Sequence, residues 1–101
     1  MIKHIVWWTM KPEADGHTGA ENAARIKKMG EELAGKIPGL LSIEMSTDIK
    51  GSGTETPTLV LQSSHPTVEA LQEYAVHPLH VAVVDVVKVC AASRNSLDYE
   101  V

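Results

Sequence analysis

The chain has 101 residues and a formal net charge of −4, from nine Lys and Arg residues against thirteen Asp and Glu. This length accommodates one domain with one core, and the scattered basic residues exclude the concentrated positive charge that nucleic acid requires. A hydrophobic fraction of 44% excludes a disordered chain. The single cysteine, Cys90, excludes an internal disulfide and fits a reducing compartment, and the N-terminal run is too short for a signal peptide or spanning helix. We therefore expect a cytoplasmic protein with no membrane association.

Residues 2–10 predict a β-strand, because they are rich in β-branched and aromatic side chains. Ile5 and Trp7 lie on one face of this strand. The opposite face contains Ile2, His4, Val6, Trp8 and Met10. Since both faces carry large apolar groups, the strand should be covered on both sides. The helices of the domain can cover one face, and the other face needs a second layer.

A helix is predicted after the turn at residues 12–16. Thr18 and Glu21 fit a capping box, in which each residue binds the backbone N–H of the other. Apolar residues then follow at spacings of three and four, as in an amphipathic helix, and Pro38–Gly39 should end it. This apolar stripe contains Ile26, Met29, Leu33 and Ile37.

Two strands are predicted next, over residues 40–48 and 58–63, and they should form a hairpin around a loop rich in Gly, Ser and Thr. In the first of them, Leu41, Ile43 and Met45 should share the buried face.

The last third of the chain predicts two helices and a final strand. Residues 64–67 look like a helix start with a proline in the first turn, and His77–Pro78 should break the helix. A second helix is expected from Pro78 to about Ala91, with one buried face. That face should contain Leu79, Val83, Val86, Val87 and Cys90. Residues 97–101 alternate as a strand.

The element order is therefore β-α-β-β-α-β, which predicts an α+β ferredoxin-like fold with a four-stranded antiparallel sheet and helices on one face. We expect one domain over residues 1–101. The other face of the sheet would present Ile5 and Trp7 to water, and contiguous apolar patches seldom remain exposed. A homodimer that buries this face, closing two sheets into a dimeric α+β barrel, is the expected assembly.

Four segments of the sequence together resemble the stress-responsive A/B barrel (Dabb) family over essentially the whole chain. The most specific is the tyrosine followed by His-Pro-x-His-Val. The segments are Lys3-His4-Ile5-Val6, Ile37-Pro38-Gly39, Tyr74-Ala-Val-His77-Pro78-Leu-His80-Val81 and Asp98-Tyr99. The resemblance implies a dimeric α+β barrel. The plant members include a cyclase that closes a linear polyketide by aldol condensation without a cofactor, and its reactive histidine is similar in position to His80.

The same resemblance implies roles for Tyr74, Asp98 and a pocket histidine at His4. From the residues alone, His80 lies on the shoulder of the buried helix face, where its side chain can reach a pocket between helix and sheet. A carboxylate at Asp98 would orient it as a general base, although a purely structural His–Asp tie is equally compatible with the pattern. The expected substrate contacts are His4, Val6, Trp8 and His77.

Three functions remain open. The first is a cofactor-free enzyme that abstracts a proton next to a carbonyl of a small apolar or phenolic molecule, with cyclase-, lyase- or isomerase-like chemistry. The second is a non-catalytic, stress-associated dimer. The third is a quinol- or heme-type oxygenase, on analogy of fold alone. A metal site is not expected, because Pro78 disrupts the helical spacing of His77 and His80 and no further ligand completes a set.

Overall fold

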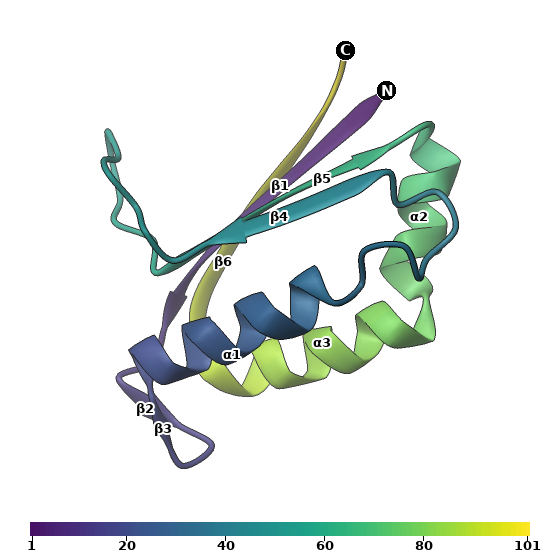
Figure 1. Cartoon of the computed structure of the whole chain (residues 1–101). Helices are drawn as coiled ribbons and strands as arrows, with labels where there is room; N and C mark the ends of the chain where they lie inside the picture. The colour runs from purple at the N-terminus through teal and green to yellow at the C-terminus, as the bar shows by residue number, and fades with distance from the viewer.

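The computed structural model describes residues 1–101 as an antiparallel sheet with helices on one face, with the two termini side by side at one end (Figure 1). The elements in chain order are β1 (Ile2–Met10), β2 (Glu13–Ala14), β3 (His17–Thr18), α1 (Gly19–Glu31), β4 (Ser42–Ser46), β5 (Leu59–His65), α2 (Val68–Val76), α3 (Pro78–Cys90) and β6 (Ala91–Glu100). The main sheet has the order β4-β5-β1-β6, with every pair antiparallel. The predicted ferredoxin-like arrangement is confirmed, including the two consecutive helices before the last strand, and β2–β3 is an addition.

Local sequence signals account for the start of α1. Asp15 and Gly16 both have positive φ angles, of 53° and 76°, which is the backbone that a two-residue hairpin between β2 and β3 requires. The capping box is present: the Thr18 hydroxyl accepts from the Glu21 N–H at 3.2 Å, and the Thr18 N–H donates to the Glu21 carboxylate at 2.9 Å. These two contacts satisfy backbone donors that a helix N-terminus leaves free.

The end of α1 differs from the prediction. The helix ends at Glu31, before the apolar stripe does, and turns follow up to Pro38. Gly35 has a φ of +76°, which is incompatible with continued right-handed helix. Leu33 and Ile37 remain buried, so the apolar pattern correctly indicates which side chains enter the core but not how far the helix extends.

The helix after β5 also begins later than predicted. Strand β5 continues to His65, and the Thr67 hydroxyl caps α2 by accepting from the Ala70 N–H at 3.1 Å. The break between helices lies where predicted: His77 ends α2, and its Nδ1 accepts from the Leu79 N–H at 3.1 Å to cap α3. Pro78 occupies the first turn, where its missing N–H costs nothing.

The main core lies between the sheet and helices α1 and α3. Its fully or nearly fully buried members include Val6, Ile26, Leu59 and Cys90. Two side chains predicted to face inward do not: Leu41 is 55% exposed, because Leu40 takes the buried position before β4, and Leu79 is 43% exposed in the first turn of α3.

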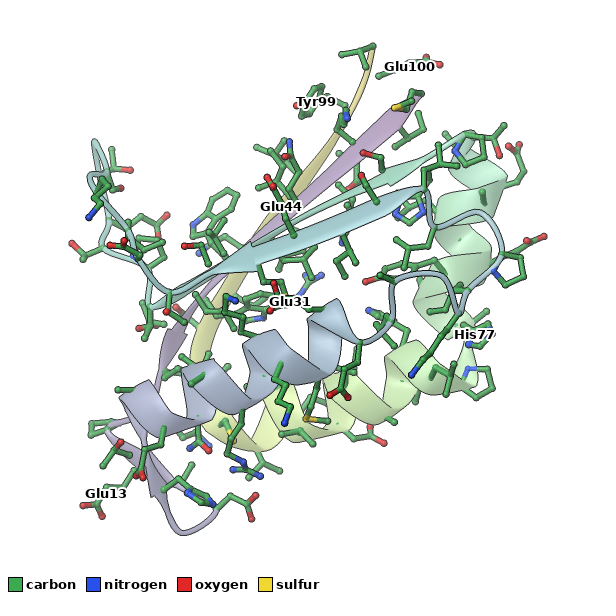
Figure 2. The ribbon with its side chains drawn as sticks, in the orientation of Figure 1. Glu13, Glu31, Glu44, His77, Tyr99 and Glu100 are labelled. Atoms are coloured by element: carbon green, nitrogen blue, oxygen red, sulfur yellow. The ribbon has the colours of Figure 1, made fainter.

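The opposite face of the sheet has no covering element within the chain (Figure 1). Figure 2 shows Glu44 and Tyr99 on this side, away from α1 and α3. Ile5 is paired across the strands with Leu97, which is 47% exposed. No helix of the chain has the length and apolar character needed to cross a membrane.

Candidate active site

A cavity of about 330 Å³ lies between the inner face of the sheet and helices α1 and α3. This volume is typical of small-molecule sites, and eleven of the sixteen residues that line it are hydrophobic. No Asp or Glu is among them. The side chains in the lining that carry polar atoms are His4, Trp8, Tyr74, His80, Lys88 and Arg94. The cavity can therefore enclose an apolar molecule and contact it at a few defined polar points.

His80 lies in the first turn of α3, and the cap by His77 and the proline at position 78 fix where that turn begins. Its Nδ1 lies 3.1 Å from the carbonyl oxygen of Ala75. Because a carbonyl oxygen only accepts, Nδ1 carries the hydrogen and Nε2 keeps a free lone pair. Burial lowers the pKa of His80. The side chain is therefore a neutral imidazole at pH 7, the form that can accept a proton.

Tyr74 stacks against His80, with ring centroids 4.2 Å apart and an angle of 39° between the rings. It projects from α2 into the core and is 1% exposed. Burial raises the pKa of Tyr74 to about 12, so the phenol keeps its proton and can donate a hydrogen bond.

His4 and Asp98 form a second polar pair at the cavity. They are direct partners in the β1–β6 register, and His4 Nδ1 donates to the Asp98 carboxylate at 2.5 Å. Directly opposite residues of an antiparallel pair project from the same face of the sheet, so the register itself brings these side chains together. The His4 ring lies 6.4 Å from that of Tyr74.

Two expectations from the sequence are corrected here. Asp98 binds His4, whereas the Nδ1 of His80 is bound by the carbonyl of Ala75, so Asp98 is not the group that orients His80. His77 does not line the cavity; its side chain caps α3 at the periphery of the molecule (Figure 2). The other expected site residues, His4, Val6, Trp8, Tyr74 and His80, all line the cavity.

His65 lies behind the site, although the sequence suggested a residue at the start of a helix. It is fully buried at the end of β5, and its ring is 4.9 Å from that of Tyr74. Its Nδ1 donates to the Gly39 carbonyl at 3.1 Å, and its Nε2 accepts from the Ser63 hydroxyl at 2.9 Å. Burial lowers the pKa of His65, which fits this neutral, doubly bonded state. His65 thus holds Tyr74 in place and takes no part in the lining.

Lys88 and Arg94 also line the cavity, and the sequence interpretation did not include them. Their spacing from predicted site residues could have indicated both of them. Arg94 lies four residues before Asp98 on β6 and therefore on the same face of that strand, and Lys88 lies two helical turns after His80 on α3.

No three His, Cys, Asp or Glu side chains lie close enough together to form a metal site. The residues that line the cavity carry apolar and hydrogen-bonding groups.

A four-stranded antiparallel sheet with helices on one face and an apolar cavity between these layers defines a ferredoxin-like α+β protein. More specifically, the chain belongs to the stress-responsive A/B barrel (Dabb) domain family, whose sequence model matches residues 2–101. The resemblance seen in the sequence is confirmed.

Solved structures with this fold come from bacteria and plants. A dimeric protein of unknown function from Bacteroides fragilis is 26% identical, with a TM-score of 0.76 over 99% of this chain and 95% of its own. A protein from Arabidopsis thaliana is 22% identical, with a TM-score of 0.81 over 100% of this chain and 95% of its own. The hydroxynitrile lyase of Passiflora edulis is 15% identical, with a TM-score of 0.78 over 99% of this chain and 92% of its own. Among curated proteins, none matches the sequence significantly.

Proposed function

We propose that the protein binds a small apolar carbonyl or phenolic molecule in this cavity and abstracts a proton from the carbon next to a carbonyl, with His80 as the base. The observation that carries the proposal is the state of His80. Its Nδ1–H is held by the Ala75 carbonyl, its Nε2 lone pair is free, and it lies at a largely apolar cavity where the neutral form is favoured.

In the proposed step, the carbon–hydrogen bond breaks and its proton moves to Nε2 of His80. The electron pair of that bond becomes the enolate, with negative charge on the former carbonyl oxygen. The Tyr74 hydroxyl, protonated and next to His80, is placed to donate to this oxygen. His4 is the second polar contact, and its ring is held in place by the hydrogen bond from Nδ1 to the Asp98 carboxylate. Reprotonation at carbon gives isomerisation, and attack of the enolate on a second carbonyl gives cyclisation.

Two features support this function over a purely structural His–Asp–Tyr cluster. The structural alternative requires His80 and Asp98 to tie the helix to the strand, and they do not bind each other. Tyr74 lines the cavity and its phenol keeps its proton, so the hydroxyl can donate to a ligand there. That the Passiflora edulis protein of the same fold is a hydroxynitrile lyase supports the fold as a scaffold for lyase-type chemistry.

The test is hydrogen–deuterium exchange of a simple apolar ketone, 2-octanone, in D₂O, followed by NMR at pH 7. The wild type should accelerate exchange of the protons next to the carbonyl above the buffer rate. His80→Ala should reduce this acceleration by about 10²–10⁴-fold, the contribution typical of one positioned base. His17→Gln, in the β2–β3 hairpin, is the matched control for loss of a histidine and should exchange at the wild-type rate.

An unchanged rate in a folded His80→Ala variant would contradict the assignment of the base. A wild-type rate no faster than buffer would contradict proton abstraction altogether.

The expected assembly is a homodimer in which a second copy covers the bare sheet face. The apolar side chains on that face, among them Ile5 and Leu97, supply the contact surface, and the protein from Bacteroides fragilis is itself dimeric. Burial of this face removes an apolar patch from water, which is the main driving force for association.

A further inference from the structure

The cavity has a second polar end, formed by Trp8, Lys88 and Arg94, and the proposed proton abstraction does not use it. Trp8 and Arg94 are direct partners in the β1–β6 register, so their side chains lie on the cavity face of neighbouring strands. Lys88 approaches from the last turns of α3. Arg and Lys are cations, and the indole nitrogen of tryptophan is a hydrogen-bond donor only. All three groups therefore favour a negatively charged acceptor.

The indole N–H of Trp8 is an independent sign of a missing ligand. Trp8 is 6% exposed, and its Nε1 is the one buried side-chain nitrogen or oxygen of the chain that has no hydrogen-bond partner. Buried donors are nearly always satisfied, so an unsatisfied one on a cavity wall calls for an explanation. An acceptor atom bound in the cavity provides one.

The charges at this end are also uncompensated. Neither Lys88 nor Arg94 forms an ion pair, and the cavity lining contains no carboxylate. Arg94 makes a long hydrogen bond from Nη1 to the Ser96 hydroxyl, at 3.3 Å. Since both side chains are largely exposed, they lie at the mouth of the cavity, where an anion can reach them without losing all its water.

The distance between the two ends follows from the elements that carry them. His4 and Trp8 are four residues apart on β1, about 13 Å along an extended strand. His80 and Lys88 are eight residues apart on α3, about 12 Å along a helix. The two histidines share one end, because both lie near Tyr74. Between the ends, the walls are apolar, with residues such as Val6, Leu61 and Val84.

We propose that Trp8, Lys88 and Arg94 form a carboxylate subsite, so that the ligand is an amphipathic keto acid: its carboxylate binds at this end, its apolar body fills the cavity, and its carbonyl reaches His80. Only the placement of the ligand's carbonyl at His80 rests on the proposed function. The carboxylate subsite itself needs only the cavity and its three donors.

Binding is measured first, by calorimetry with octanoate and with octanamide, which share one apolar body and differ in charge. Wild type should bind octanoate at least about tenfold more tightly than octanamide, as expected for hydrogen bonds to a charged group. Arg94→Met and Lys88→Met should each reduce octanoate affinity by about tenfold and leave octanamide unchanged. Trp8→Phe, which keeps an aromatic side chain but removes the N–H, should also reduce the preference for octanoate.

The matched control is Lys28→Met, which removes an exposed lysine of α1 that does not line the cavity and should leave both affinities unchanged. The preference for octanoate should also fall as salt is added, because the cations are exposed. Equal binding of octanoate and octanamide by wild type, or unaltered octanoate binding by Arg94→Met, would overturn the subsite.

The ketone exchange assay separates the two proposals. If wild type exchanges 2-octanone and 7-oxooctanoate equally well, the assignment of His80 as the base stands and the proposed carboxylate subsite is wrong. If octanoate binds through Arg94 but neither ketone exchanges, the subsite is retained and the proposed reaction is wrong. If both hold, 7-oxooctanoate should exchange at lower concentrations than 2-octanone, and Arg94→Met should remove that advantage.

Discussion

Replacing Leu97 by Ala tests whether a second copy covers the bare face of the sheet. Leu97 lies on β6 and is 47% exposed within one protomer. The substitution removes three carbon atoms, each worth about 0.8 kcal/mol when fully buried. The half already buried in the protomer therefore costs about 1 kcal/mol of folding free energy, and the half buried only in a dimer adds about 1 kcal/mol per protomer. Since a symmetric interface contains Leu97 twice, the dimer should weaken by about 2 kcal/mol, or roughly thirtyfold in Kd.

Leu79→Ala is the matched control, because Leu79 is 43% exposed but lies on α3, on the helical side of the molecule. It should lower the free energy of unfolding by about 1 kcal/mol and leave the dimer Kd unchanged. Sedimentation over a range of protein concentrations gives Kd, and urea unfolding gives the stability of each variant. A wild type that sediments as a monomer throughout, or equal Kd values for the two variants, would refute the proposed interface.

Three further predictions concern the histidines and their partners. Burial lowers the pKa values of His65 and His80 below their ordinary value of 6.5, so the unfolded chain takes up protons that the folded chain resists. The free energy of unfolding should therefore be highest above pH 6.5 and should fall as the pH drops from 6.5 towards the folded-state pKa values. A flat profile between pH 7 and pH 5 in urea titrations would contradict this assignment. For the same reason, the exchange activity of His80 should persist to below pH 6.5 before its Nε2 is protonated. Asp98→Asn should slow 2-octanone exchange severalfold while changing the melting temperature little, because the Asp98 side chain is half exposed and such pairs contribute at most about 1 kcal/mol. A wild-type rate in Asp98→Asn would remove His4 from the reaction.

The local features of the fold were predictable because they depend on neighbours in the sequence. The capping box of Thr18 and Glu21 and the helix break at His77–Pro78 lie where the sequence indicated. The end of α1 was not predictable in this way, because the apolar period continues through turn residues that follow the end of the helix at Glu31. An apolar sequence pattern indicates which side chains are buried, and side chains in turns can be buried as fully as those in a helix.

In the candidate site, too, the local features were predictable from the sequence and the contacts between distant residues were not. The position of His80 on the shoulder of its helix already indicated access to a pocket between helix and sheet, and the structure places it at the cavity. The partner of His80 was assigned wrongly, because the sequence places Asp98 on a strand but does not show which residue of β1 lies opposite it. An antiparallel pairing shifted by one residue would send every β6 side chain to the other face.

The sequence by itself determined the order of elements, the family and the presence of large apolar side chains on both faces of β1, because alternation, caps and breaks are encoded within a few residues. The tertiary structure alone decided which side chains meet. The β1–β6 register joins His4 to Asp98 and Trp8 to Arg94, across separations of 94 and 86 positions, and so divides one cavity between an end that can move a proton and an end that can hold a charge. Such pairs depend on how distant strands align, and that alignment is set by the packing of the whole core.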